Sequence, residues 1–300
     1  MARDSGKLGP EFTYDLTELR KVDPALVWYE ETGAVATGMA APRGIALDSG
    51  GRLLVAGDEK VRVFEDGKPA GQFAVGGPPH CLAAWPDGTV YVGLKERVEV
   101  YSPGGKRKAA WQPLGERAYT TGLAVGADNV FVADAGSRLL WRFDPEGKVL
   151  ARIGAKDEAK HAPGLVIPSP YCDVALGPEG MLWLTDTGRR RVECYTYDGA
   201  YRFAWGKASM KIEGFCGCCN PTHLAIDGRG RFFTSEKGLP RVKRHDPEGT
   251  FECVVAPPTA FADGTTGLDL AVDAAGHVLV LDPHRRAVRK FEAKNDKDTS

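Results

Sequence analysis

The sequence predicts an all-β protein: a six-bladed β-propeller of four-stranded antiparallel blades, with the ring closed by the N-terminal strand. Three observations lead to this prediction. A unit of three short apolar strands joined by polar turns recurs six times along the chain. Its spacing runs from 37 residues (Ile45 to Leu82) to 51 residues (Leu123 to Val174), which is the period of a propeller blade. Finally, 37 glycines and 20 prolines suit many short strands with tight turns.

The six copies follow one another from the N-terminus, and each opens on the innermost strand of a blade. The first is PRGIALDSGGRLLVAGDEKVRVFEDGK and the fourth is YCDVALGPEGMLWLTDTGRRRVECYTYDG. The first large aliphatic residues of the copies, which we expect on six equivalent innermost strands, are Ile45, Leu82, Leu123, Val174, Leu224 and Leu270.

A fourth, outermost strand is predicted between successive copies, in runs near Phe73, Trp111, Ile153, Phe203 and Val254. The sixth copy ends without such a run. Residues 25–38 can supply it, which would hide both end strands of the ring from edge-to-edge aggregation. We therefore expect an N-terminal leader or tail over residues 1–24, one propeller over residues 25–294 and a C-terminal tail over residues 295–300.

Composition and charge exclude some classes of protein. With 43% hydrophobic and 26% charged residues, the chain is typical of a soluble globular protein. A net charge of -1 argues against nonspecific nucleic-acid binding, which needs a basic surface. No segment has the length of apolar residues that a membrane helix needs.

In a propeller, the innermost strands all begin at one mouth of the central channel, so their first residues should form two rings there. Because successive residues of a strand point to opposite sides, only one ring can face the channel fully. We expect the ligand site at this mouth, for a small molecule or a protein. The first ring comprises Arg43, His80, Thr121, Cys172, Thr222 and Leu268, and the second comprises Gly44, Cys81, Gly122, Asp173, His223 and Asp269.

The long connection from residue 208 to residue 220 carries the run GFCGCCNP and leads into the fifth copy. Long connections in compact domains are often functional. The thiol and imidazole groups expected at the mouth suit a transition metal such as zinc, copper or an iron–sulfur centre, or else a disulfide. Free structural cysteines with no cofactor are the third alternative. The candidate residues are Cys216, Cys218, Cys219, Cys81, Cys172, His80 and His223.

Within this run, we expect Cys216 to pair with Cys218 or Cys219, because the intervening Gly217 permits a tight turn. The side chains of the adjacent Cys218 and Cys219 are expected to diverge. Cys194 and Cys253 fall inside strand patterns and are predicted to be core residues. Three histidines lie in predicted turns or loops and should be solvated: His161, His245 and His277.

The turns between second and third strands are rich in charge. Acidic residues there are expected to brace the blades through ion pairs with the neighbouring bases. A surplus of positive charge would give a rim that favours an anionic ligand. The candidate rim residues are Arg189, Arg190, Arg191, Lys237 and Arg241.

The repeated pattern resembles that of NHL-repeat proteins, on the segment PRGIALD and on the spacing D-x-G-x-R from Asp134 to Arg138. The GFCGCCNP segment followed by FFTSEKGLPRVK is similar to a bacterial subgroup of that family. The resemblance implies a soluble protein that is periplasmic or otherwise exported. It also implies a binding or redox-associated scaffold, with a metal-dependent hydrolase or lyase at the same mouth as the alternative, so whether the chain is an enzyme is left open. A resemblance to peptidyl-hydroxyglycine lyase would imply further Pro-His pairs at the starts of the innermost strands, and only Pro79-His80 matches there.

Overall fold

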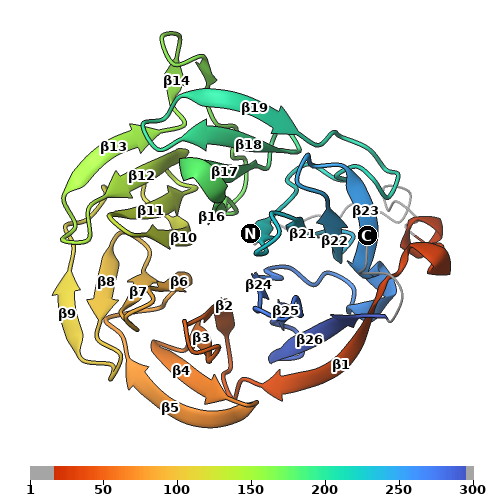
Figure 1. Ribbon diagram of the computed structural model, residues 1–300, viewed down its shortest axis with the longest axis horizontal. Coiled ribbons are helices and arrows are strands. Elements are labelled where there is room, and N and C mark those ends of the chain that lie inside the picture. The colour runs from red at the N-terminus through yellow and green to blue at the C-terminus, as the bar shows by residue number, and fades with distance from the viewer. Residues whose placement is uncertain (1–16, 295–300) are drawn as a thin grey trace, which may run out of the picture.

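The computed structural model describes residues 17–294, which form a ring of six four-stranded antiparallel sheets around a central channel (Figure 1). This confirms the predicted propeller. Each large aliphatic residue that opens a copy lies on the innermost strand of its own sheet. The predictions for residues 1–16 and 295–300 lie outside the described part of the chain.

The first three blades follow the chain in order, from the innermost to the outermost strand. Blade one comprises β2 (Pro42–Leu47), β3 (Leu53–Gly57), β4 (Lys60–Glu65) and β5 (Lys68–Ala74). Blade two comprises β6 (Cys81–Ala84), β7 (Val90–Gly93), β8 (Val98–Tyr101) and β9 (Arg107–Ala110). Blade three comprises β10 (Thr120–Gly126), β11 (Asn129–Asp134), β12 (Leu139–Phe143) and β13 (Val149–Ile153).

The next two blades repeat the order after a short hairpin, β14 (Lys156–Asp157) and β15 (Ala162–Pro163), which projects from the ring (Figure 1). Blade four comprises β16 (Val174–Leu176), β17 (Met181–Asp186), β18 (Arg191–Thr196) and β19 (Tyr201–Trp205). Blade five comprises β20 (His223–Ile226), β21 (Phe232–Glu236), β22 (Arg241–His245) and β23 (Phe251–Ala256). Short 3-10 turns are η2 (Glu18–Arg20), η3 (Pro24–Leu26), η4 (Pro178–Gly180) and η5 (Pro258–Ala260).

The sixth blade joins the two ends of the ring, as the sequence predicts. Its strands are β24 (Leu270–Val272), β25 (Val278–Asp282), β26 (Ala287–Ala293) and, outermost, β1 (Tyr29–Ala36). Strand β1 pairs antiparallel with β26 from Tyr29 opposite Ala293 to Ala36 opposite Ala287. The outer edge of β26 is therefore covered rather than left open.

The apolar core lies between blades. Each seam between two neighbouring blades holds one cluster of buried side chains, such as Phe131 and Leu140 of blade three against Leu182 and Leu184 of blade four. Cys194 and Cys253 belong to such clusters, so their assignment to the core is confirmed. No helix among residues 17–294 has the length and apolar character needed to span a membrane.

Acidic residues at the ends of second strands brace the blades, as expected. Asp134 accepts backbone N–H groups of Tyr119 and Ser137, at 2.8 and 3.0 Å. Asp186 accepts from Arg189 and from the connection before its own blade, through the N–H group of Val166. The acids thus fasten the turn that follows them to the segment that leads into the innermost strand.

Candidate functional site

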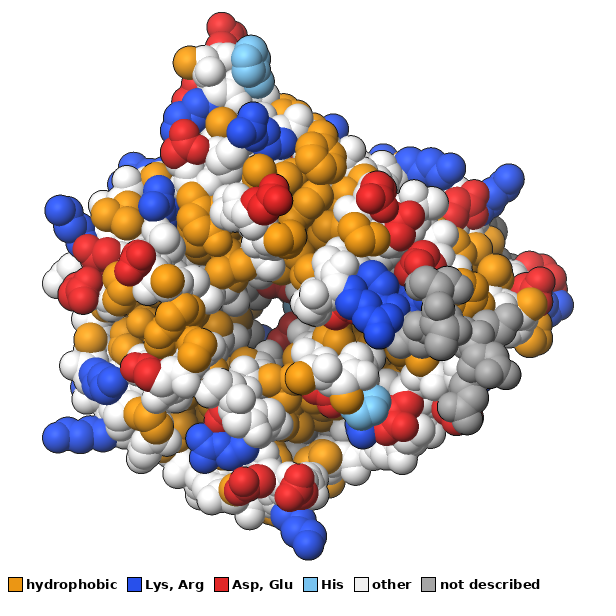
Figure 2. Space-filling view, viewed as in Figure 1, with side chains coloured by type: hydrophobic (Ala, Val, Ile, Leu, Met, Phe, Trp, Pro, Cys, Tyr) orange, Lys and Arg blue, Asp and Glu red, His pale blue; other side chains and the backbone are white. Residues whose placement is uncertain are grey.

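A cavity of about 340 Å³ lies at the mouth of the channel, and all six blades contribute to its wall. Figure 2 shows an opening at the centre of the ring, with acidic side chains visible inside it. Predicted ring residues in the wall are Arg43, His80, Thr121, Cys172 and His223. The other residues of the wall are Ala40, Ala41, Pro42, Tyr119, Pro170, Tyr171, Thr266, Gly267 and Pro283.

Two predicted ring residues, Asp173 and Asp269, connect neighbouring blades. The Asp173 carboxylate accepts the N–H group of Val174 on its own strand and that of Leu224 on the next blade, both at 2.9 Å. Asp269 repeats the arrangement with Leu270 and, across the junction of blades six and one, with Ile45, both at 2.8 Å. These two acids therefore act first as links between innermost strands.

Burial raises the pKa of Asp269 to about 6, against the opposing effect of its two backbone hydrogen bonds. Burial also raises the pKa of Asp173 well above its usual range, and the charge of Asp269 raises it further. Two carboxylates that share one channel resist being ionised together. The channel below the mouth therefore holds two acidic groups, at least one of which can keep its proton at mildly acidic pH.

The glycines of the second ring fit these links. A Cβ atom on Gly122 would lie 2.3 Å from Asp173 Oδ1 and 3.1 Å from Asp173 Cα. Gly44 approaches the backbone of His80 and Cys81 in the same way. Their lack of a side chain lets adjacent innermost strands come close, so these positions serve packing.

His80 lies half-buried in the wall beside Tyr119, with ring centroids 4.5 Å apart. Its Nδ1 lies 3.1 Å from the Thr120 carbonyl oxygen, which can only accept, so Nδ1 carries the proton and Nε2 keeps its lone pair. Burial lowers the pKa of His80, and the positive charges of Arg43 and Lys95 lower it further. A neutral imidazole with a free Nε2 can accept a proton or bind a metal ion.

His223 lies deeper and is only 8% exposed. Its Nδ1 is 3.1 Å from the Thr222 hydroxyl and 3.3 Å from the Ser235 hydroxyl, while the Tyr171 ring meets it edge-on at 5.8 Å. Burial lowers the pKa of His223 to about 4, so it is uncharged at neutral pH. Thr222 is itself buried and hydrogen bonded to Ser235, and it stands behind the cavity wall.

Cys81 and Cys172 are buried at the mouth as protonated thiols. Burial is the largest cause that raises the pKa of each, and the charge of Asp173 adds to it. The hydroxyl of Thr121 donates to the Cys172 carbonyl oxygen at 2.6 Å, which ties blade three to the start of blade four. These two cysteines therefore fill space between strands and are poor nucleophiles.

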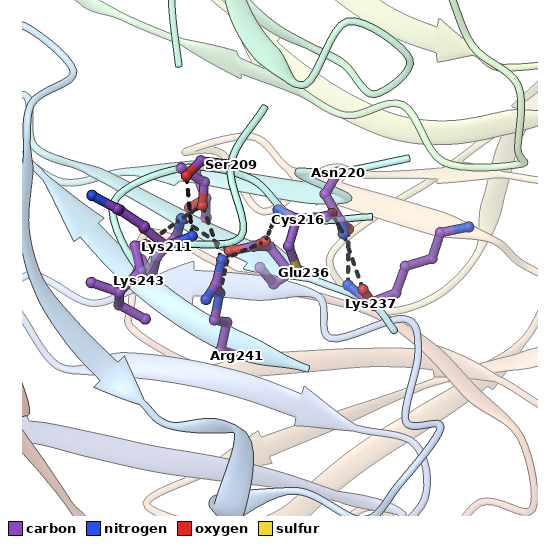
Figure 3. Close-up of polar contacts among 12 residues, drawn as sticks. Ser209, Lys211, Cys216, Asn220, Glu236, Lys237, Arg241 and Lys243 are labelled. Carbon is purple, nitrogen blue, oxygen red and sulfur yellow. Dashed lines mark hydrogen bonds and ion pairs between the residues drawn. The ribbon is translucent and has the colours of Figure 1, made fainter. Parts of the chain in front are cut away.

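The cysteine-containing connection is fixed to blade five by a buried ionic cluster (Figure 3). The Glu236 carboxylate accepts from Arg241 at 2.6 and 3.0 Å, pairs with Lys243 at 3.0 Å and accepts the Cys216 N–H group at 3.0 Å. The side chains of all three charged residues are at most 1% exposed. The Gly214 carbonyl oxygen accepts from both Arg241 and Lys243.

Desolvation is the main cause that lowers the pKa of Lys243 to about 8, against the attraction of Glu236. Burial and the Glu236 charge together raise the pKa of the Cys216 thiol. The cluster thus keeps Cys216 as a thiol and holds the start of the cysteine run in place. Lys243 was not among the candidates from the sequence, because it occurs inside a strand pattern with nothing to mark it as buried.

Cys218 and Cys219 correct one expectation. Their side chains do not diverge, because their sulfur atoms lie 3.2 Å apart. Cys218 is exposed and Cys219 is 5% exposed, and Ser169 lies beside the Cys219 thiol. Ser169 precedes Pro170 and Tyr171 of the cavity wall, so the pair lies next to the mouth although it does not line the cavity.

Within residues 17–294, no three His, Cys, Asp or Glu side chains are grouped closely enough to hold a metal ion. Cys216 is held at Glu236, whereas Cys81 and Cys172 are buried in seams between blades. His80, Cys172 and His223 share the cavity wall, but within the described residues no three of the predicted thiol and imidazole ligands lie close enough together to hold one ion. All seven cysteines are free thiols.

The candidate rim residues have several different partners. Arg189 pairs with Asp186 at 2.6 Å, Arg191 pairs with Glu193 at 2.5 Å, and Arg190 donates to the Gly217 carbonyl oxygen at 3.3 Å. Arg241 is buried in the cluster already described and does not reach an exposed rim. Lys237 lies over the Tyr171 ring, with its ammonium 4.8 Å from the ring centroid, and so borders the cavity.

Sequence reasoning missed Tyr119 and Tyr171 as wall residues. Tyr119 lies two positions before Thr121, and Tyr171 lies one position before Cys172. This closeness to predicted ring residues was the signal in the sequence that could have identified them as wall residues. The expectation that His245 is solvated is wrong: it is 1% exposed on β22, against Thr234 and Trp205. His277 is half-buried and contacts Asp273 at 2.7 Å.

The described geometry defines the class of protein as a six-bladed β-propeller with a polar cavity at its channel mouth. No family model matches the chain, and no curated protein matches it. Solved structures do. A streptogramin B lyase is 12% identical with a TM-score of 0.63, over 89% of this chain and 98% of that chain.

A virginiamycin B lyase from Staphylococcus aureus is 13% identical over 89% of this chain and all of that chain, with a TM-score of 0.63. A protein of unknown function from Bacteroides thetaiotaomicron is 15% identical over 89% of this chain and 72% of that chain, with a TM-score of 0.65. At these identities the likeness shows the shared propeller fold and nothing finer.

Proposed function

We propose that this propeller is a binding protein whose channel mouth takes a small molecule with an anionic group. The observation that carries the proposal is Arg43. It is an exposed cavity residue, and no ion pair or hydrogen bond joins its side chain to the rest of the chain between residues 17 and 294. Guanidinium groups bind carboxylates and phosphates through two parallel hydrogen bonds.

Other charges at the mouth support the same ligand class. The positive charge of Lys95, like that of Arg43, lowers the pKa of His80, so Lys95 adds to the positive charge near this residue. Lys237 borders the opposite part of the wall, over Tyr171. The rings of Tyr119 and Tyr171 offer flat surfaces for the body of the ligand, which we therefore expect to be planar or aromatic.

Isothermal titration calorimetry with benzoate and phenyl phosphate tests the proposal. We expect Arg43→Ala to weaken binding at least tenfold and added salt to weaken wild-type binding. The matched control is Arg202→Ala, which removes an exposed arginine from the outermost strand of blade four. Equal effects of the two substitutions, or no binding of either probe by the wild type, would remove the support for an anion site.

A lyase or hydrolase that acts at the same mouth is the second candidate, and His80 favours it. Its Nε2 keeps a lone pair in a cavity that can hold a substrate, which is what a general base needs. One of the similar solved structures is a catalytically inactive histidine-to-alanine variant of virginiamycin B lyase with quinupristin. Consumption of quinupristin, followed by chromatography, should therefore be measured for wild type, His80→Ala and His223→Ala. Absence of turnover by the wild type rejects that substrate.

We also propose that the chain is an exported bacterial NHL-repeat protein, in which the GFCGCCNP connection has a redox-associated role. The support is the resemblance in sequence described above. A transition metal at the cysteines and histidines of the mouth stays a prediction. Elemental analysis of the purified protein tests it, and a metal content well below one per chain would reject it.

A further inference from the structure

We propose that Cys218 and Cys219 form a vicinal dithiol that reversibly closes to a disulfide on reaction with a low-molecular-weight disulfide such as oxidised glutathione. The proposal goes beyond the ligand site at the channel mouth and does not depend on it. It assigns a covalent modification site to one pair of adjacent residues on the surface of the propeller.

The geometry of the two thiols carries the proposal. Their sulfur atoms lie 3.2 Å apart, within the distance at which a thiol donates a hydrogen bond to sulfur. A bond between them requires about 2.05 Å, so the atoms have to approach by only about 1 Å. The exposed Cys218 is open to a small reagent, while Cys219 lies behind it at 5% exposure.

The backbone that carries Cys218 and Cys219 is held on both sides. On one side, Cys216 donates its N–H group to Glu236 of the buried ionic cluster. On the other side, the Asn220 side chain donates to the carbonyl oxygens of Cys216 and Lys237 and accepts the N–H group of Lys237, at 2.6, 3.0 and 2.9 Å (Figure 3). Between these attachments, Gly217 takes a φ of 72°, which favours glycine. The two sulfur atoms therefore lie close together because the backbone on both sides of them is held, and not through contact with each other alone.

The reaction balances as a two-step thiol–disulfide exchange. The Cys218 thiolate attacks one sulfur of oxidised glutathione, forms a mixed disulfide and releases one glutathione thiolate. The Cys219 thiolate then attacks the Cys218 sulfur and releases the second glutathione. The two cysteines are oxidised, one disulfide is reduced to two thiols, and the two protons that leave the cysteines end on the glutathione thiols.

The closed form should be easy to reduce. Adjacent Cα atoms are about 3.8 Å apart across a trans peptide, which is shorter than the spacing of at least about 4.4 Å that disulfides usually span. Strained and exposed disulfides are those that exchange readily. The pair is thus suited to cycle between two states rather than to staple the connection permanently.

Intact-mass analysis of the full chain after treatment with oxidised glutathione tests the proposal. We expect loss of two hydrogen atoms, a fall from seven to five titratable thiols, and full reversal by millimolar reduced glutathione. Fragmentation should place the modification on Cys218 and Cys219. Before oxidation, the wild type should also bind one phenylarsine oxide per chain, since this reagent bridges two nearby thiols.

Variants separate this pair from other pairings. In Cys219→Ser the second step is blocked, so a stable glutathione adduct should accumulate on Cys218. In Cys216→Ser the loss of two hydrogen atoms should persist. It should persist equally in the matched control Cys194→Ser, which changes a cysteine inside a strand. The proposal is overturned if Cys216→Ser abolishes the intramolecular disulfide, or if the wild type accumulates only the glutathione adduct. If Cys219→Ser does not fold, the fragmentation and arsenical measurements on the wild type decide alone.

Discussion

Replacing Glu236 by glutamine tests whether the buried ionic cluster holds the cysteine-containing connection in place. The change keeps the size of the side chain and removes its charge. Arg241 and Lys243 would then be two buried cations without a counter-ion, at side-chain exposures of 1% and 0%. Removal of one partner from a buried pair destabilises a protein by about 3–5 kcal/mol.

We therefore expect the free energy of unfolding to fall by about 3–5 kcal/mol. At about 2 °C per kcal/mol for a chain of this size, the melting temperature should fall by about 6–10 °C. Urea unfolding followed by tryptophan fluorescence measures the first quantity, and calorimetry measures the second. Trp205, which packs on Phe215 of the same connection, lies close to the site of the change.

Glu193→Gln is the matched control. The Glu193 carboxylate is as buried as that of Glu236, but its cationic partners Arg191 and Arg189 are 26% and 30% exposed and can be solvated when the pairs are broken. The control should lose about 1 kcal/mol. If the two substitutions cost the same, or if Glu236→Gln costs less than 1 kcal/mol, the cluster does not restrain the connection in the way described.

Three further predictions concern the channel and the closure of the ring. The pKa of Asp269 is raised to about 6 in the folded state, so as pH rises the unfolded chain loses this proton before the folded chain does. The contribution of Asp269 to the free energy of unfolding should therefore fall between about pH 4 and pH 6. In urea unfolding, the difference between wild type and Asp269→Asn should change by up to about 3 kcal/mol over that range and then level off. Gly122→Ala places a Cβ atom 2.3 Å from Asp173 Oδ1 and should cost about 1–3 kcal/mol, measured by the same unfolding, whereas Gly71→Ala, which meets nothing within 4 Å, should be tolerated. Deletion of residues 25–38 exposes the edge of β26 and should cause aggregation in size-exclusion chromatography; a monomeric product with an unchanged melting temperature would contradict the role of β1.

The architecture could be predicted from the sequence because each blade repeats the same physical requirement. Every innermost strand needs an aliphatic residue for the seam with its neighbour, and Ile45 and Leu224 mark two such strands. The closing strand could be predicted because the sixth copy lacks an outer strand and residues 25–38 have a suitable pattern. Both the repeat period and the missing outer strand can be recognised from the sequence alone.

The details of the site depend on side-chain directions that no period reveals. Lys243 and His245 alternate along β22 like residues of a solvated strand, yet both are buried, because the connection before blade five covers them. Cys218 and Cys219 turn toward each other because Asn220 and Cys216 fix the backbone on either side. Contacts of this kind join residues that are well separated along the chain, such as Phe215 and His245, so the sequence alone does not indicate which residue is the partner.

The antiparallel pairing of β1 with β26 has a mechanical consequence. Tyr29, at the start of β1, is opposite Ala293, at the end of β26. Two attachments, one before Tyr29 and one after Ala293, would therefore pull at the same end of this strand pair, once the hydrogen bonds of Trp28 to Val254 and of Arg20 to Pro258 and Phe261 have broken. Tension between two such attachments would act across the strand pair at that end and peel the hydrogen bonds apart one after another, instead of loading them all at once. The propeller would therefore open at blade six under low force, by separation of β1 from β26, while the other five blades, each formed by a continuous stretch of chain, would stay intact.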